Sequence, residues 1–242
     1  MQSSVASGEI MRLTTLEWAP NVASDMPEQG VIASVVKQVA SQAGLETQIR
    51  FAPWSRVVQV GASDPAYAGY FPAFYTKERE KTCYFSGVIG HTIIGFAYLK
   101  DKPLHWKKLP DLQGTTIGIV QEYVNGEDFD ALVRAHVLTT DIAPSDISNL
   151  RKLLAGRVDV IVISKEVLRQ LLLTDPGLQA AKEQIVFHSK ELTNFSMHIC
   201  FQKNERGLDL QKRFNAELGK ANTKKMENTY FQQLQTSKSG SR

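Results

Sequence analysis

Strand-like apolar segments alternate with helix-like amphipathic segments along most of this sequence, and this alternation restricts the fold more than any other feature. A helix between two strands returns the chain to the same edge of a sheet, so the pattern predicts an α/β protein with largely parallel sheets. The predicted strands cover residues 11–19, 46–52, 66–71, 92–99, 115–120, 159–163 and 196–202. The predicted helices cover residues 31–45 and 146–157, which close at Gly44 and Gly156, and a last region from about 208 to about 234.

Two stretches interrupt this alternation. The first, Tyr98–Gly114, contains lysines, two prolines and a tryptophan, and we interpret it as a crossing between two lobes. The second, Phe187–Ser196, has an irregular pattern and precedes one more strand and the last helical region. We therefore predict that residues 9–98 and 195–242 form lobe 1 and that residues 99–194 form lobe 2.

The composition is that of a folded globular protein and argues against several functions. The 242 residues are 43% apolar and 22% charged, which is enough for a sizeable core in one large domain or two small ones. The net charge of +3 is spread along the chain without a basic block, so nucleic acid is not an expected partner. The longest apolar runs are far shorter than the roughly 20 residues of a membrane-spanning helix.

The compartment is left open by the residues alone. The start of the sequence lacks the basic and apolar regions of a secretory signal, so the protein is either cytoplasmic or one whose signal has been removed. Cys83 and Cys200 are compatible with two buried thiols, which we take as the default, or with a single disulfide.

Five short motifs carry a resemblance to a known family. They are EWAP (17–20), PWSR (53–56), TKER followed by YFS (76–86), LPDLQGTTIGIVQ (109–121) and LLAGRVDVIVIS (153–164). In this order and spacing the chain resembles the type II periplasmic solute-binding proteins, in particular the family of the polar amino-acid receptors of ABC importers (bacterial extracellular solute-binding protein family 3). The resemblance extends from about Leu13 to about Leu234.

The resemblance implies a fold and a function. It implies two α/β lobes, joined by two crossing segments, that close by a hinge motion on a small ligand in the cleft between them. It also implies a monomeric periplasmic receptor that delivers its ligand to the permease of an ABC importer, without enzymatic activity. In the same fold, Cys200 lies in the strand that returns to lobe 1, where Cys83 lies, so the two cysteines are expected to be neighbours.

Arg79 is the expected ligand clamp. It matches the arginine that binds the ligand's α-carboxylate in the amino-acid receptors, and it follows the aromatic run of Tyr70, Phe71 and Phe74. The resemblance implies that these aromatic residues form part of the cleft wall, with Phe71 and Phe74 as ligand contacts. A guanidinium suits this role because its planar fork donates two parallel hydrogen bonds to a carboxylate and stays charged when desolvated. The local sequence alone favours an exposed helix residue paired with Glu78 or Glu80, and the family pattern around Arg79 favours the clamp.

Other expected ligand contacts depart from the family pattern. Ser164 stands where the receptors carry an aspartate that binds the ligand's ammonium group, and Pro72 and Phe74 replace small hydroxyl residues. A cation buried without a carboxylate partner costs several kcal/mol, so an α-amino acid held in the usual way is not expected. The remaining predicted contacts are Gln121, Tyr123 and Asn125 in the second lobe, and Trp18 and Trp54 in the first, for which packing in the core is the alternative. This set indicates an anionic ligand with an apolar or ring-bearing body.

Catalytic and metal motifs are missing from the sequence. The histidines have no paired spacing and neither cysteine belongs to a CxxC motif, so no metal or cofactor is expected. Two alternatives to a transport receptor remain. One is a dehydratase-like enzyme that uses Glu166 as general acid, although an exposed glutamate at a helix start is the simpler interpretation. The other is the ligand-sensing domain of a signalling system.

Overall fold

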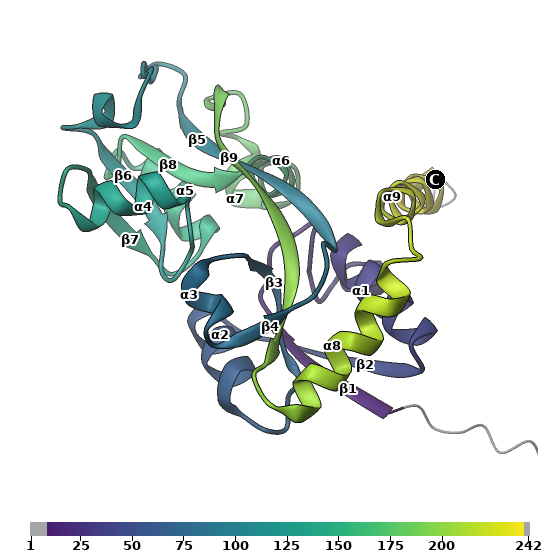
Figure 1. The fold of residues 1–242 in the computed structure, drawn as a ribbon. Helices are drawn as coiled ribbons and strands as arrows, with labels where there is room; N and C mark the ends of the chain where they lie inside the picture. Colours follow the sequence, from purple (N-terminus) through teal and green to yellow (C-terminus); the bar gives the residue numbers. More distant parts are fainter. Residues whose placement is uncertain (1–8, 240–242) are drawn as a thin grey trace, which may run out of the picture. The chain divides into compact units, whose positions relative to one another are not determined.

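The computed structural model describes residues 9–239, which divide into two compact units. Unit 1 takes the chain up to Gly90 and again from Ser196, and unit 2 takes His91–Phe195. The chain passes from unit 1 to unit 2 in strand β5 (Gly90–Leu99) and returns in strand β9 (Ile185–Gln202), as can be followed in Figure 1. The α/β class predicted from the sequence is confirmed.

Unit 1 is built on a mixed sheet with the strand order β2-β1-β3-β9, in which β4 pairs with β9. Strand β1 is parallel to β2 and β3, whereas β9 is antiparallel to β3 and β4. The strands that lie wholly in this unit are β1 (Glu9–Thr15), β2 (Leu45–Phe51), β3 (Gly69–Phe74) and β4 (Cys83–Phe85). The helices are η1 (Pro27–Gln29), α1 (Val31–Gln42), α2 (Trp54–Ser63), α3 (Lys77–Glu80), α8 (Glu205–Leu218) and α9 (Thr223–Ser239).

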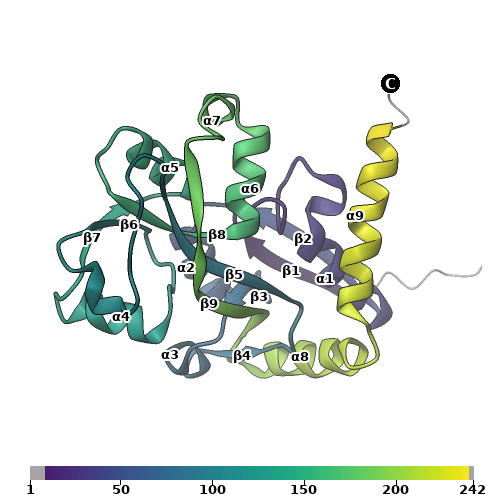
Figure 2. The ribbon, with the colours of Figure 1, turned by 90° about the horizontal axis from the view of Figure 1, so that it is seen from above.

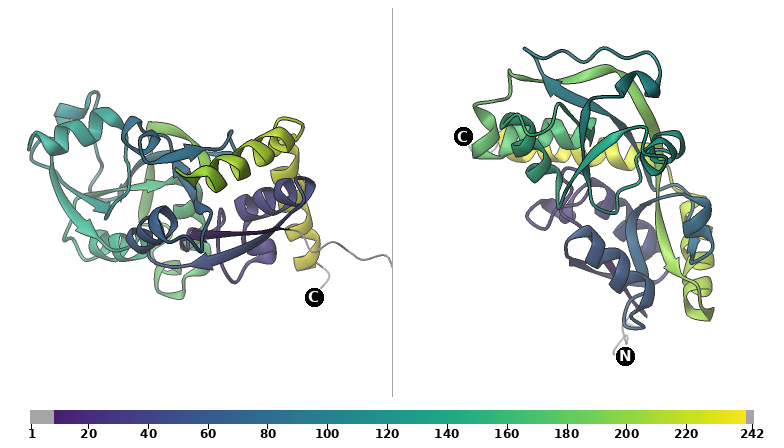
Figure 3. Two further views of the ribbon diagram at one scale, coloured as in Figure 1. Left: turned by 60° about the horizontal axis from the view of Figure 1, so that its bottom comes forward. Right: turned by 90° about the vertical axis from the view of Figure 1, so that its left-hand side faces the viewer.

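The apolar pattern of the sequence produces the core of unit 1. In β1, Met11 and Leu13 are fully buried, and the residue between them, Arg12, is exposed, as expected for a strand with one face on the core. Helix α1 contacts α8 and α9, and these helices are visible in both views of Figure 3. Phe214 of α8 packs against Phe201 of β9 with ring centroids 6.0 Å apart. The end of β9 therefore packs against helix α8 and also pairs with strands β3 and β4.

A disulfide joins Cys83 to Cys200 in unit 1, so the default expectation of two buried thiols is wrong. The register explains the bond: Cys83 lies opposite Gln202 and Cys200 lies opposite Phe85, so the two cysteines are diagonal neighbours rather than a direct pair. Their Cα atoms are 5.5 Å apart, which is within the usual range for a disulfide. The sequence does not determine this register, and a shift of one residue would have turned the side chains to opposite faces.

The strands of unit 2 follow the order β5-β8-β6-β7 in a sheet of nine strands among the described residues. Strand β6 is parallel to β7 and β8, and β5 is antiparallel to β8. Its further strands are β6 (Thr116–Val120), β7 (Thr139–Ala143) and β8 (Val160–Ser164). Its helices are η2 (Leu109–Leu112), α4 (Glu127–Arg134), α5 (Asp146–Leu154), α6 (Lys165–Thr174) and α7 (Pro176–Gln179), of which α5 and α6 contact β8 (Figure 2).

The structure differs from the predicted elements where polar residues form strands. Residues 187–196, predicted to be irregular, belong to β9, which is continuous over 18 residues, so that prediction is wrong. Its middle has exposed and half-buried positions on both faces, as at Lys190 and Glu191, so it lacks apolar alternation. The short strand β7 was also missed. Over the described residues, no helix is both long enough and apolar enough to span a membrane.

The segment Tyr98–Gly114, interpreted as a crossing, lies within unit 2. The predicted lobe boundary at residues 98/99 falls at the end of β5, and the compact units divide earlier in that strand, after Gly90. The predicted boundary at residues 194/195 lies one residue before the division at Phe195.

Candidate functional site

Arg79 is held in a defined position at the end of the aromatic run in unit 1. It belongs to the short helix α3, whose preceding residue, Thr76, accepts a hydrogen bond from the Arg79 backbone N–H at 3.1 Å. The guanidinium donates to the carbonyl oxygen of Phe74 at 3.1 Å and lies over the ring of Trp54, 5.6 Å from its centroid. The side chain is half-buried. The structure therefore fixes this cation by contacts with the aromatic segment, which an exposed helix arginine would not make.

Aromatic rings form the surroundings of this arginine. Trp54, the first residue of α2, is buried and packs edge-on against Tyr70 with ring centroids 5.8 Å apart. Burial raises the pKa of Tyr70, and the positive charge of Arg79 partly opposes that rise. Trp18 packs against Phe74 at 6.1 Å. Four of the five residues that the sequence predicted in lobe 1 are therefore linked through direct contacts: Arg79, Trp54, Phe74 and Trp18.

Phe71 lies apart from that group. Its side chain is 0% exposed and its carbonyl accepts a hydrogen bond from the hydroxyl of Thr15 at 2.7 Å. Phe71 is a core residue of β3, a strand in which residues 69–73 are all buried.

Trp18 brings an unpaired donor to unit 1. Only 5% of the residue is exposed, and its indole N–H is buried without a hydrogen-bond acceptor in the described part of the chain. A buried donor in this condition costs free energy, which a ligand that offers an acceptor would recover.

In unit 2, Tyr123 and Asn125 lie in the loop between β6 and α4, where their side chains bond to acidic residues. The Tyr123 hydroxyl donates to the carboxylate of Asp146 at 3.1 Å. Burial raises the pKa of Tyr123 well above its ordinary value, and the Asp146 charge adds to the rise. The backbone N–H of Asn125 donates to Asp130 at 3.1 Å, and its amide group lies 3.4 Å from the same carboxylate. Gln121, at the start of the loop, has an exposed side chain.

Ser164 belongs to a cluster of two hydroxyls and a carboxylate. It ends β8 and caps helix α6 by accepting a hydrogen bond from the backbone N–H of Val167. The hydroxyl of Thr92 donates to the Ser164 oxygen at 2.9 Å, and the Ser164 hydroxyl lies 3.2 Å from the carboxylate of Glu166. Thr92 also lies 3.4 Å from that carboxylate. An acidic group is thus present beside the serine that replaces the expected aspartate.

Sequence reasoning missed Thr92, Asp130 and Asp146 as parts of this arrangement. Asp146 is 6% exposed and begins α5. A carboxylate at a helix start is ordinarily an exposed residue stabilised by the helix dipole, so the sequence carries no sign of its contact with Tyr123. Thr92 is 72 residues from Ser164, and only the pairing of β5 with β8 brings them together.

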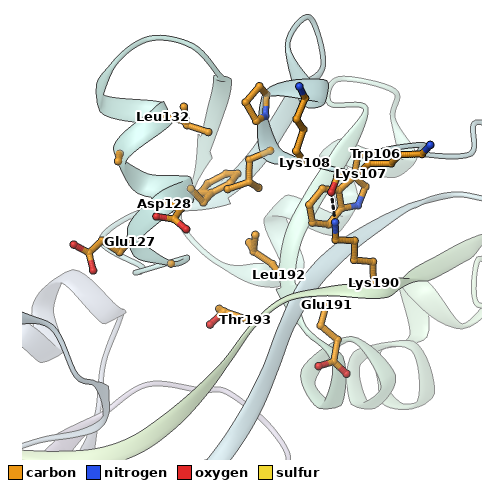
Figure 4. A pocket seen from close by; sticks show the side chains of 15 residues that line it. Trp106, Lys107, Lys108, Glu127, Asp128, Leu132, Lys190, Glu191, Leu192 and Thr193 are labelled. Atoms are coloured by element: carbon orange, nitrogen blue, oxygen red, sulfur yellow. Dashed lines mark hydrogen bonds between the residues drawn. The ribbon is translucent and has the colours of Figure 1, made fainter.

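Unit 2 also contains an open cavity of ≈ 760 Å³ that is lined by the segment after β5, by α4 and by residues 190–193 in the first half of β9. Figure 4 shows Lys190 over the ring of Trp106, with its ammonium group 4.2 Å from the ring centroid and bonded to the Lys107 carbonyl. Acidic residues, Glu127 and Asp128, line the opposite side. Charges of both signs line this cavity, so it indicates no particular ligand. Among the described residues, no group of three metal-binding side chains is present.

Comparisons with known proteins extend the assignment of the fold. No protein-family model matches the sequence, and no curated protein sequence matches it. Among solved structures, an ancestral arginine-binding protein bound to arginine is similar, with a TM-score of 0.76 and 15% identity over 94% of this chain and 98% of that one. A histidine kinase sensor domain with similarity to periplasmic binding proteins has a TM-score of 0.77 and 15% identity over 93% and 95% of the two chains.

A third similar structure is the GluR0 ligand-binding core from Nostoc punctiforme in complex with (L)-glutamate. Its TM-score is 0.72, with 16% identity over 92% of this chain and 98% of that one. These structures are alike over nearly the whole chain. The chain therefore has the two-lobe fold of the type II periplasmic binding proteins, and the predicted fold is confirmed.

Proposed function

We propose that this chain is an extracytoplasmic solute-binding receptor that closes on a small anionic ligand and delivers it to an ABC importer. Arg79 binds the ligand's carboxylate, and Trp18, Trp54 and Phe74 contact its apolar or ring-bearing body. Gln121, Tyr123, Asn125 and Ser164 supply further contacts from unit 2. The receptor binds and releases the ligand unchanged and acts as a monomer.

The observation that carries the proposal is the position of the Arg79 guanidinium. One N–H bonds to the Phe74 carbonyl and the planar group lies over Trp54, so its orientation is set before a ligand arrives. A guanidinium has several N–H donors in a rigid fork, which suits a carboxylate more closely than a lysine ammonium does. Similar structures support binding as the function of the fold, since one holds arginine and another glutamate.

The ligand class includes amino-acid-like compounds as well as aromatic acids. The carboxylate of Glu166 lies beside Ser164 and offers an ammonium group a partner that position 164 lacks. If the ligand carries an amine, Glu166→Gln should weaken its binding; for a ligand without an amine, the same change should leave binding unchanged or improve it.

The disulfide supports an oxidising compartment for this receptor. Structural disulfides persist in the periplasm and outside the cell and are rare in the cytosol. The bond between Cys83 and Cys200 thus favours a periplasmic location over the cytoplasmic alternative.

A thermal-shift screen of small carboxylates, aromatic acids and amino acids tests the proposal, because a bound ligand stabilises the folded state by mass action. Calorimetry then compares Arg79→Ala and Arg79→Lys with the control Arg56→Ala, an exposed arginine of α2. We expect Arg79→Ala to cost about 2 to 5 kcal/mol of binding free energy and Arg79→Lys nearly as much. Unchanged affinity in both Arg79 variants would contradict the clamp.

A sensing role is the second candidate, favoured by the similarity to a histidine kinase sensor domain. Deletion of the gene separates the two. A transport receptor predicts loss of ligand uptake, whereas a sensor predicts unchanged uptake and loss of the transcriptional response to the ligand. A dehydratase-like activity of Glu166 predicts turnover of prephenate-like acids, which a binding protein leaves intact.

A further inference from the structure

A groove in unit 2 lies outside the proposed ligand contacts and has an apolar floor with a cationic rim. It has a volume of ≈ 450 Å³ and is formed by α6, the segment after α7 and the beginning of β9 (Figure 2). Its apolar lining consists of Leu168, Leu172, Leu173, Ile185 and Phe187. Its charged lining consists of Lys165, Glu166, Arg169 and Lys182.

The three cations of the rim lack acidic partners. Lys165, Arg169 and Lys182 are exposed, and none of them makes a salt bridge or a side-chain hydrogen bond within the described residues. Lys165 and Arg169 are four residues apart on α6, a spacing at which like charges destabilise a helix. Lys165 also lies over the ring of Phe187, 5.9 Å from its centroid, and Glu166 is the one carboxylate among the lining residues. The like-charge pair on α6 is the part of the rim that acidic groups from outside would relieve.

The apolar floor is only partly covered. Leu168 and Ile185 are buried, but 57% of Leu173 is exposed and Leu172 is half-buried. The ring of Phe187 packs against Gly95 of β5, where a Cβ atom would lie 2.6 Å from the ring. The absence of a side chain at Gly95 therefore leaves the room that the tip of the Phe187 ring occupies. A side chain of moderate size could cover Leu173 by entering beside it.

Glu166 connects the groove to the cluster around Ser164. It lines the groove, and its carboxylate accepts hydrogen bonds from the hydroxyls of Ser164 and Thr92. The first turn of α6 thus lines the groove, and it also carries the carboxylate that is bonded to Ser164 of the proposed ligand site.

We propose that this groove docks an acidic segment of a partner protein that inserts one apolar side chain beside Leu173. Charge complementarity selects this occupant: the lining carries two cations one helical turn apart on α6 and a third, Lys182, from the segment after α7, against the single carboxylate of Glu166, which is bonded to Ser164. A concave floor favours a protein segment over a lipid bilayer, which requires a flat or protruding surface.

The test uses a fluorescein-labelled peptide of glutamate and leucine, with two comparison peptides in which serine replaces leucine or lysine replaces glutamate. Fluorescence anisotropy should show saturable binding of the glutamate–leucine peptide that weakens as salt is added. The serine peptide should bind at least about tenfold more weakly, and the lysine peptide should not bind.

Variants assign the binding to the groove. Leu173→Ser removes the exposed leucine beside which the apolar side chain of the peptide inserts. The double variant Arg169→Glu with Lys182→Glu reverses two charges of the rim. All three side chains are exposed, so folding should be unaffected. Each variant protein should bind at least about tenfold more weakly. Arg157→Glu, an exposed arginine of the same unit outside the groove, is the matched control and should keep the affinity.

Three results of the peptide experiment would overturn the proposal, and one result of a vesicle experiment would do the same. They are the absence of saturable binding, an equal loss in the Arg157→Glu control, and equal binding of the leucine and serine peptides. Sedimentation with phosphatidylcholine vesicles containing phosphatidylglycerol forms the last arm. Vesicle binding that depends on Leu173 and the rim, without peptide binding, would identify a membrane surface instead and would also overturn it.

Discussion

The two units position their candidate ligand residues by different means. In unit 1, Arg79 contacts the ring face of Trp54 and the backbone carbonyl of Phe74, whose ring packs edge-on against Trp18. In unit 2, three of the four polar candidates are bonded to an acidic residue: Tyr123 to Asp146, Asn125 to Asp130 and Ser164 to Glu166. The fourth, Gln121, is exposed.

This difference separates residues to which the sequence can assign a ligand contact from residues to which it cannot. A cation among aromatic residues is recognisable from its neighbours in the chain. A serine or tyrosine is assigned only when its hydrogen-bond partner is known, because the same residue types also serve as caps and loop anchors. Unit 2 is therefore the unit in which a polar side chain is most easily mistaken for a ligand contact.

The largest expected effect concerns unit 1. Tyr70, which packs against Trp54, lies opposite Cys200 in the pairing of β3 with β9, so the disulfide anchors the strand beside the aromatic group. The double variant Cys83→Ala with Cys200→Ala should lower the free energy of unfolding by about 5 kcal/mol, because the bond closes a long loop in the unfolded chain. Urea unfolding measures this loss.

Titration of the denatured, non-reduced protein with a thiol reagent checks the bond itself. No reactive thiol is expected. Two reactive thiols per chain would exclude the disulfide and remove its support for a periplasmic location.

A prediction of intermediate size compares one buried side-chain amide in unit 1 with one in unit 2. Gln202 in unit 1 is buried, and its amide nitrogen donates to the carbonyls of Gly61 at 3.0 Å and Asp64 at 2.8 Å. Asn149 in unit 2 is 0% exposed, and neither its oxygen nor its nitrogen has a hydrogen-bond partner within the described chain. The two amides should respond to replacement in opposite ways.

Gln202→Leu should lower the free energy of unfolding by about 1 to 3 kcal/mol, because two buried carbonyls lose a donor. Asn149→Leu should raise it by about 1 to 2 kcal/mol, because an unpaired amide is replaced by an apolar group of similar size. Thermal unfolding of both variants gives the signs. A loss of stability in Asn149→Leu would mean that the amide has a partner, such as a buried water.

The smallest expected effect concerns the hydrogen bond from Tyr123 to an acidic residue in unit 2. Tyr123→Phe removes the donor to Asp146 and should lower the free energy of unfolding by about 1 kcal/mol. Tyr67→Phe is the matched control in unit 1, because its hydroxyl only accepts a surface hydrogen bond from Arg50. That variant should unfold like the unmodified protein. Equal losses in the two variants would argue against a special role for the Tyr123 bond.

Much of the fold was predictable because most strands and helices bury one face. Met11 and Leu13 follow the strand period, and the apolar residues of α1 follow the helix period. The middle of β9 and the edge strand β7 were not predictable, because their side chains are exposed on both faces; Ile142 of β7, for example, is 60% exposed. Polar strands of this kind are set by backbone pairing with neighbours distant in the chain.

For the site, Arg79 was identified only through the motifs around it, since its local charge pattern alone fits an exposed helix. The structure adds its contacts with Trp54 and Phe74. The acid beside Ser164 was not expected to be there: Glu166 was considered as a catalytic acid, and its contact with Ser164 depends on the side-chain arrangement at the start of α6. Ligand contact by any of these residues stays a prediction.

The bond between Cys83 and Cys200 also bears on how the protein withstands proteases. The whole of unit 2, His91–Phe195, lies between these two cysteines, which are 117 residues apart in the sequence. This part of the chain is therefore a closed covalent ring. A protease that cuts one exposed loop of unit 2 opens the ring but does not release a fragment, and the nicked protein migrates as a single species until it is reduced. Two cuts in unit 2 are needed before any piece of it can diffuse away.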